Sequence, residues 1–334
     1  MATQRIPWIR LKVEPEILKT LNQRSDFKGF RQVFIQLFVT IALGILSYKA
    51  FKTQPLYVSI PIFYLYGTVY SFSYYSGALH ELSHNTVFRT KWLNECFSMV
   101  FSFMSWGDYV FFNLSHTQHH AFTTHHDLDQ EVVLPNQVTW FYVLQKFTID
   151  FTRLYSDDII DSIWSSFRRA LGVIKPGRET ELLNGHVKKT RKLIRWNRCL
   201  ISGHLLLILF IIVTKEWLLL LLITFAAFFG QWLNFLVSLT QHTGMQPNVN
   251  DFRYNCRSVK LNPIFGFLYW QMHYHIEHHM YGGIPFYNLK KLHTLLEDQL
   301  PKRKGLIGSL IEVYIAVRKQ KCDPDYHVAV VIPK

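Results

Sequence analysis

The sequence predicts an all-α integral membrane protein that forms a single domain over residues 1–334, with four transmembrane helices arranged as two hairpins. Hydrophobic residues make up 49% of the chain and aromatic residues 16%, and the apolar residues lie in long, nearly uncharged blocks. Several blocks approach the ~20 residues that a helix needs to cross the ~30 Å hydrocarbon core of a bilayer. The net charge of +13 comes from basic residues that flank these blocks, a distribution typical of membrane proteins.

The first hairpin is predicted from spans 33–51 and 56–79. Both blocks are apolar, and Lys52 and Pro55 lie in the short connection between them. Because a short connection makes neighbouring helices antiparallel, the two spans should pack side by side. Before them the sequence predicts either a short helix on the membrane surface, beginning at Pro15 because proline is favoured in the first turn of a helix, or a disordered arm.

The next apolar block, residues 92–113, is interrupted by Trp106-Gly107-Asp108. A glycine followed by a carboxylate is unsuited to a continuous span in lipid, so we expect a re-entrant or interfacial segment rather than a crossing. Residues 156–174 alternate apolar and charged side chains with the period of an amphipathic helix. The strongly basic stretch 175–198 is expected to form a soluble loop with a short helix.

The second hairpin is predicted from spans 199–214 and 217–238, which Lys215 and Glu216 separate. Beyond it, Pro285 is expected to start a helix. Two hairpins place both termini and the region between the hairpins on one side of the membrane. That side carries nearly all the lysines and arginines, so the positive-inside rule predicts that it faces the cytosol.

Three histidine clusters lie just outside the predicted spans. An α-helix advances ~3.6 residues per turn, so histidines three or four positions apart share one face. Histidine accounts for only 16 of the 334 residues, so two copies of H-x-x-H-H are not expected by chance. The candidate metal ligands are the histidines of these clusters and the one that follows the fourth span: His80, His84, His116, His119, His120, His242, His275, His278 and His279.

These imidazoles exceed the needs of one metal ion, since a closed zinc site takes four ligands. Two metal ions with four or five nitrogen ligands each would use all of them. Neutral imidazole suits zinc, copper, iron and nickel, and a nitrogen-rich site that faces the reducing cytosol favours iron, with O₂ as co-substrate. The four cysteines are widely spaced, so no thiolate metal site is predicted.

The three boxes, H-x-x-x-H, H-x-x-H-H and H-x-x-H-H, resemble those of the membrane fatty acid desaturase and hydroxylase superfamily. The resemblance spans roughly residues 56–292 and is especially close over residues 273–288. It implies a cytosolic helical cap on four transmembrane helices, in which the histidines named above hold two Fe ions. It also implies a desaturase-like oxidation, in which O₂ and two electrons introduce a double bond into an acyl chain or similar apolar substrate.

The resemblance further implies partners and a location. Electrons would come from a separate carrier such as cytochrome b5 or a ferredoxin, which a basic cytosolic face attracts when the carrier is acidic. The protein would be multi-pass in the endoplasmic reticulum if eukaryotic, or in the inner membrane if bacterial, with the histidine boxes and both termini cytosolic. No nucleic-acid-binding motif accompanies the basic residues, so nucleic acid is not an expected partner.

Residues that orient the metal-binding histidines can be predicted as well. Metal-bound histidines usually donate their second N–H to a carboxylate, a carbonyl or water, which makes Glu81, Asp129 and Glu277 candidates for this outer shell. Acyl-CoA desaturases often place an asparagine four residues before the histidine that follows the fourth span, where this chain has Ser238. Asn234 lies on roughly the same helix face and is the candidate replacement.

Other functions are compatible with the same residues. Hydroxylation of a lipid or a secondary metabolite shares its first hydrogen abstraction with desaturation, and histidine spacing does not separate the two. His80-Glu81-Leu82-Ser83-His84 also matches the H-E-x-x-H pattern of zinc proteases, although both H-x-x-H-H boxes would then be unused. A metal transporter would hold its ions near the bilayer midplane, whereas these clusters lie outside the predicted spans.

Overall fold

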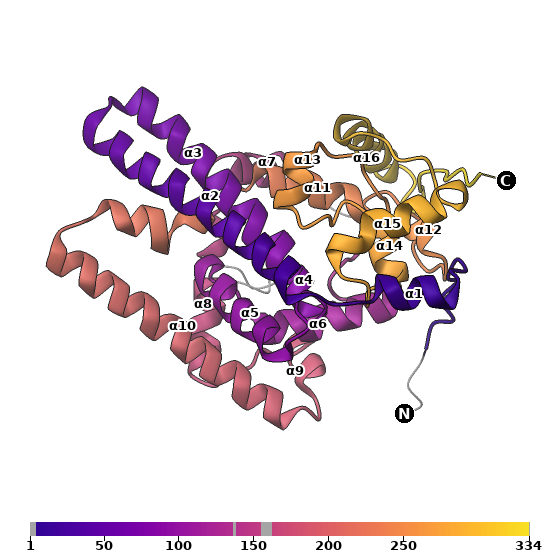
Figure 1. The fold of residues 1–334 in the computed structure, drawn as a ribbon, viewed down its shortest axis with the longest axis horizontal. Coiled ribbons are helices and arrows are strands. Elements are labelled where there is room, and N and C mark those ends of the chain that lie inside the picture. Colours follow the sequence, from indigo (N-terminus) through magenta and orange to yellow (C-terminus); the bar gives the residue numbers. More distant parts are fainter. Residues whose placement is uncertain (1–4, 136–137, 155–161, 334) are drawn as a thin grey trace.

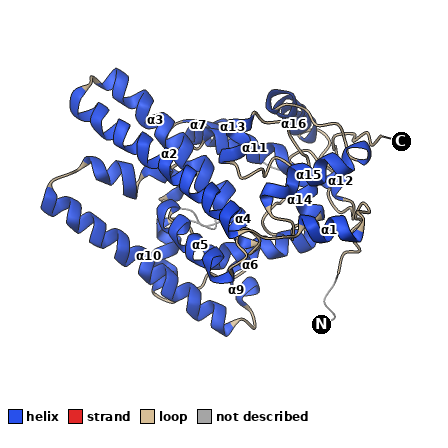
Figure 2. Cartoon of the chain, in the orientation of Figure 1, coloured by secondary structure: helices blue, strands red, loops and turns tan. Residues whose placement is uncertain are grey.

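The computed structural model describes residues 5–135, 138–154 and 162–333, and over these ranges the regular structure is helical with only isolated β-bridges (Figure 2). The α-helices are α1 (Pro15–Leu21), α2 (Asp26–Thr53), α3 (Leu56–Ser73), α4 (His80–Ser83), α5 (Lys91–Ser105), α6 (Tyr109–Phe122), α7 (Trp140–Phe147), α8 (Ile163–Ala170), α9 (Arg178–Leu183), α10 (Val187–Thr214), α11 (Trp232–His242), α12 (Phe252–Asn255), α13 (Pro263–Leu268), α14 (His275–Met280), α15 (Phe286–Leu296) and α16 (Leu306–Gln320). Shorter π- or 3₁₀-helical segments are η1 (Tyr74–Leu79), η2 (Phe151–Arg153), η3 (Leu220–Thr224), η4 (Ala226–Phe228) and η5 (Glu297–Gln299).

The first predicted hairpin is present as α2 and α3, which pack side by side along their length (Figure 1). In α2 large apolar side chains are exposed and polar side chains are buried, the reverse of the pattern of a helix on the surface of a water-soluble protein. Phe34, Phe38 and Ile41 are exposed, whereas Gln32 and Gln36 are buried and hydrogen-bond to the segment before α14. Apolar side chains outside and polar side chains between helices are what a bilayer favours.

Two helices, α2 and α10, are long and apolar enough to cross a membrane by length and composition. The predicted count of four spans therefore stays a prediction. α3 carries no charged residue, but several tyrosines and serines and the interior Pro61 lie among its apolar residues. The basic stretch 175–198, predicted as a soluble loop with a short helix, contains the short helix α9, but its part from Val187 onward forms the first turns of α10. Residues 156–161 of the predicted amphipathic helix lie outside the described residues, and the rest contains α8.

The predicted span 217–238 is not one continuous helix, and whether this segment crosses the membrane stays a prediction. The chain passes through η3 and η4, becomes extended at Phe229, and continues as α11 only from Trp232. The break packs directly against α3. Ser71 donates a hydrogen bond to the carbonyl oxygen of Phe229 at 2.9 Å, and Trp232 donates one to Thr68 Oγ1 at 2.9 Å. Contacts between segments far apart in the sequence thus override the helical preference of this apolar block.

Gly230 makes this close packing possible, because its φ is +68° and an added Cβ would lie 2.3 Å from the backbone nitrogen of Thr68. We expect Gly230→Ala to lower the thermal unfolding temperature strongly, since both the backbone conformation and the contact with α3 oppose a side chain. Gly305→Ala is the matched control, because an added Cβ there has no atom within 4 Å and its φ is negative. Equal unfolding temperatures for the two purified variants would contradict this packing.

The interruption predicted inside residues 92–113 is present. α5 ends at Trp106, which adopts a left-handed conformation, and α6 begins at Asp108, whose carboxylate accepts hydrogen bonds from two backbone N–H groups of the first turn. The first two histidine clusters, on either side of this segment, meet in space: His84 Nε2 lies 3.2 Å from His116 Nε2. A segment 92–113 that does not cross the membrane has to bring these two clusters back to the same side, as it does here. Its position relative to a membrane stays a prediction.

The two hairpin turns lie at one end of the molecule, and α1, α14 and α15 lie at the other end (Figure 1). A hydrogen bond from Tyr48 to Glu216 at 2.6 Å joins the end of α2 to the second turn, and Lys52 lies 3.4 Å from the same carboxylate. The long helices thus form a scaffold, and the histidine-bearing elements α4, α6 and α14 form a cap on it.

Candidate metal centre

The histidine clusters converge in the cap. α3 continues through the π-helical segment η1 into α4, and α6, the end of α11 and α14 supply the other histidines. The side-chain ligand atoms form two groups, and within each group these atoms lie within 4.8 Å of one another. Group one consists of His80, His84, His116, His120 and His278, and group two of His242, Cys256, His275 and His279.

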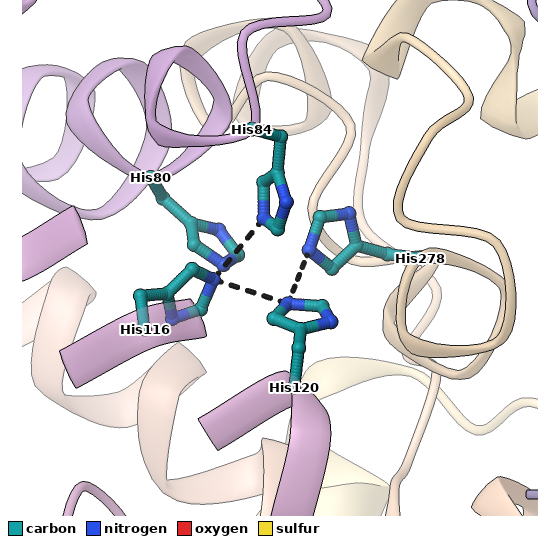
Figure 3. A group of neighbouring side chains, drawn as sticks. All are labelled: His80, His84, His116, His120 and His278. Atoms are coloured by element: carbon teal, nitrogen blue, oxygen red, sulfur yellow. Dashed lines mark hydrogen bonds between the residues drawn. The ribbon is translucent and has the colours of Figure 1, made fainter. Parts of the chain in front are cut away.

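Group one is a ring of imidazoles that surround a common centre, each with a nitrogen near the others (Figure 3). The Nε2 of His116 lies 3.2 Å from that of His84 and 3.1 Å from that of His120, and the Nε2 of His120 lies 3.1 Å from that of His278. The ring of His80 completes the group, with its centroid 4.1 Å from that of His116. Histidines from all three boxes therefore meet at one point.

These histidines are neutral at pH 7. Burial lowers the pKa of His84 to about 4, and burial together with repulsion from neighbouring imidazoles holds the pKa values of His80, His116, His120 and His278 well below the usual value. A neutral imidazole presents one nitrogen lone pair, which is the form that binds a metal ion. The ring is thus a set of unprotonated nitrogen donors.

The arrangement of hydrogen bonds around group one fits a metal ion. Glu131 Oε1 accepts from His116 Nδ1 at 2.9 Å, so in the neutral ring the proton is on Nδ1 and the lone pair of Nε2 points inward. His278 Nδ1 lies 3.3 Å from Glu81 Oε1, although these two atoms are not hydrogen-bonded to each other. The Nε2 atoms of neighbouring rings lie 3.1–3.2 Å apart, so without a cation two such rings attract each other only when one of them carries its proton on Nε2. A bound cation would accept the lone pairs of all these rings at once.

Group two has a similar construction. The Nε2 of His275 lies 2.8 Å from that of His242 and 3.1 Å from that of His279. The carbonyl oxygen of Asn255 accepts from His242 Nδ1 at 2.9 Å, so His242 also directs the lone pair of Nε2 toward its neighbours. Burial lowers the pKa of His242 to about 3. Thr123 Oγ1 lies 3.1 Å from His279 Nδ1 and orients that ring.

The two groups are adjacent. The ring of His120 stacks on that of His279 with centroids 4.2 Å apart, although the two belong to different groups. His119 lies beside group two, with its ring centroid 5.0 Å from that of His242 and 4.9 Å from that of His279. Its Nδ1 is 2.8 Å from Asp129 Oδ2, which leaves Nε2 free to face the group. Burial opposes the protonation of His119, but the Asp129 carboxylate outweighs burial and raises its pKa.

Cys256 is a member of group two that sequence reasoning missed. Its thiol is fully buried and donates a hydrogen bond to Asn255 Oδ1 at 3.2 Å. Burial raises its pKa well above the usual value, so the thiol is protonated in the absence of a metal ion. The sequence contains no signal for this position, because Cys256 is distant from every box and has no neighbouring cysteine.

The predicted outer-shell residues divide into two pairs. Asp129 contacts His119, and Glu81 lies near His278, as described above. Glu277 instead contacts His293 Nδ1 and accepts from Ser258 at 2.6 Å. Asn234 accepts from Ser76 and from Ser238, and donates to Gln231 at 3.1 Å. Glu131 was not predicted, because its contact with His116 depends on the loop after α6 turning back on that helix.

A cavity of about 390 Å³ lies beside both groups. Histidines from group one and from group two line it, together with His119. The nitrogen donors suit iron, zinc, copper or nickel rather than magnesium or calcium, which prefer oxygen ligands. Two such metal ions next to a cavity would form a centre that can act on a bound molecule.

The comparisons with known proteins agree with this chemistry. The family model described as fatty acid desaturase matches residues 55–310, which is well over half of the chain and includes every histidine of the two groups. A comparison with curated proteins gives no match.

Proposed function

This chain belongs to the fatty acid desaturase family, and from that membership we propose that it is an O₂-dependent di-iron oxidoreductase that introduces a double bond into an acyl chain or similar apolar substrate. The observation that carries the proposal is the arrangement of two adjacent, nitrogen-rich groups that line one cavity. Hydroxylation of a comparable substrate is the alternative, because it begins with removal of the same hydrogen atom.

In this proposal group one holds one iron, and His119 with the histidines of group two holds the other. When bound, two irons would supply the redox chemistry that protein side chains lack: they would pass electrons from the external carrier to O₂ and allow hydrogen to be removed from an unactivated C–H bond. Glu131 and Asp129 hold the rings of His116 and His119 so that each Nε2 stays directed inward. The cavity places the substrate chain beside both groups, and the burial of the histidines keeps bulk water away.

We further propose the membrane arrangement that the sequence predicts. The exposed apolar faces of α2 and α10 support the proposal that these helices span the membrane. α3 and the interrupted segment 217–238 would provide the other two crossings. The cap and both termini would be cytosolic, in the endoplasmic reticulum if the cell is eukaryotic or at the inner membrane if it is bacterial. Electrons would come from a separate acidic carrier such as cytochrome b5 or a ferredoxin, drawn by the basic cytosolic face.

The test is lipid and metabolite profiling of cells that express the wild type or His279→Ala. We expect at least one product to appear with the wild type and to be absent with the variant, because His279 belongs to group two and its ring meets that of His120. A product two hydrogens lighter than its precursor supports desaturation, whereas a product heavier by one oxygen supports hydroxylation. Identical profiles from equal amounts of both membrane-inserted proteins would contradict an oxidative function.

A further inference from the structure

Part of the cavity wall is charged. Lys146 from α7, Arg153 from η2 and the intervening Asp150 line the same cavity as the histidines of both groups. All three side chains are buried, with exposed fractions of 9%, 6% and 2% respectively. An apolar acyl chain alone would have no group to offer this wall.

The cations of this wall outnumber its carboxylate. Lys146 Nζ donates to Asp150 Oδ2 at 2.6 Å, and the same oxygen lies 4.0 Å from Arg153 Nε. The other carboxylate in the lining, Glu131, is engaged by His116 and by Ser115. Two buried cations therefore share one carboxylate, so this part of the wall has a local excess of one positive charge, although Glu131 balances the formal charge of the lining as a whole.

Not every N–H donor of the Arg153 guanidinium is hydrogen-bonded. Its Nη1 donates to the carbonyl oxygen of Ser105 at 2.6 Å, and its guanidinium lies over the ring of Tyr75, 4.8 Å from the centroid. Its Nε has no hydrogen-bond partner in the described part of the chain. A buried guanidinium with a free N–H that lines a cavity is suited to bind a carboxylate, which accepts hydrogen bonds from planar donors.

We propose that the substrate carries a free carboxylate, which binds Arg153 and Lys146 and holds the neighbouring carbon chain against the two histidine groups. This inference rests on the proposed function and names its substrate class. One unbalanced positive charge matches a monoanionic carboxylate better than a phosphate dianion. An ester or thioester has no charge at that position. The oxidised carbon is therefore close to the carboxylate.

The binding test uses the full-length metal-loaded protein in nanodiscs, titrated with dodecanoate, dodecanol, methyl dodecanoate or dodecanoyl-coenzyme A. We expect the wild type to bind dodecanoate at least about tenfold more tightly than the three uncharged or esterified probes, as a charge-assisted hydrogen bond allows. Arg153→Gln should abolish this preference, and Arg153→Lys should restore part of it. Arg318→Gln is the control, because Arg318 is an exposed cation on α16 and should leave the preference unchanged.

Equal affinity of the wild type for dodecanoate and dodecanol would overturn the proposal, whatever the variants do. A preference for dodecanoate that survives in Arg153→Gln would overturn the assignment of Arg153 and Lys146. If Arg153→Gln does not fold, the wild-type preference and its reduction in Arg153→Lys decide the question. Binding does not require oxidation, so the two proposals fail separately: oxidation of a neutral lipid without acid preference would leave the proposed function intact and overturn this one.

Discussion

His120→Ala is expected to lower the bound iron from about two ions per chain to about one and to reduce turnover at least ~100-fold. His120 is where the two groups meet: its Nε2 lies 3.1 Å from those of His116 and His278, and its ring stacks on His279. Loss of an outer-shell partner alone costs ~10–100-fold in metal affinity or activity, so loss of a ligand should cost at least as much. Elemental analysis and turnover of the purified variant measure both effects.

The control for this substitution is His327→Ala, which changes an exposed histidine of the C-terminal tail that belongs to neither group. Both variants should elute as folded protein on size exclusion, and His327→Ala should keep the wild-type iron content. A His120→Ala protein that is folded and retains the full iron content would show that group one does not hold a metal ion through this residue.

Asp129→Asn is expected to weaken metal binding by ~10–100-fold and to lower the unfolding temperature. The Asp129 carboxylate accepts from His119 Nδ1 and from the backbone N–H of Thr124 through Oδ2, and from the N–H groups of Glu131 and Val132 through Oδ1. These partners keep its pKa at about 2 despite burial. An asparagine amide would direct its own N–H groups at donors in either orientation, so at least one hydrogen bond becomes a repulsive contact. Competition with a chelator of known affinity measures the change.

Asp127→Asn is the matched control, because Asp127 is exposed in the same loop and asparagine tolerates its φ of +63°. It should leave metal affinity and unfolding temperature close to the wild-type values. If the two variants lose metal to the same small extent, the orientation of His119 by Asp129 has no effect on the centre.

The sequence predicts most of the cap because its key information is local. Histidines three or four positions apart share a helix face whatever surrounds them, so the spacing within each box determines a common direction. The break between α5 and α6 is equally local, since Gly107 and Asp108 interrupt an apolar block. Given these two features, the meeting of His84 and His116 follows.

What the sequence does not predict depends on contacts between distant segments. The break in residues 217–238 exists because Phe229 and Gly230 pack on the backbone of α3. The hydrophobic pattern of the sequence gives no sign of this contact. Cys256 joins group two, and Glu131 reaches His116, only because loops fold back onto the helices. The charged wall of the cavity has the same origin, since Lys146 and Arg153 lie far from every box in the sequence.

The central claim is that the two histidine groups hold two irons. Elemental analysis of the full-length protein, purified without chelators from cells grown with iron and zinc, tests this claim most directly. The account predicts about two irons per chain and little zinc, because the two groups offer nitrogen donors for two separate ions. One zinc per chain, with iron absent, would contradict it and would favour the H-E-x-x-H alternative instead.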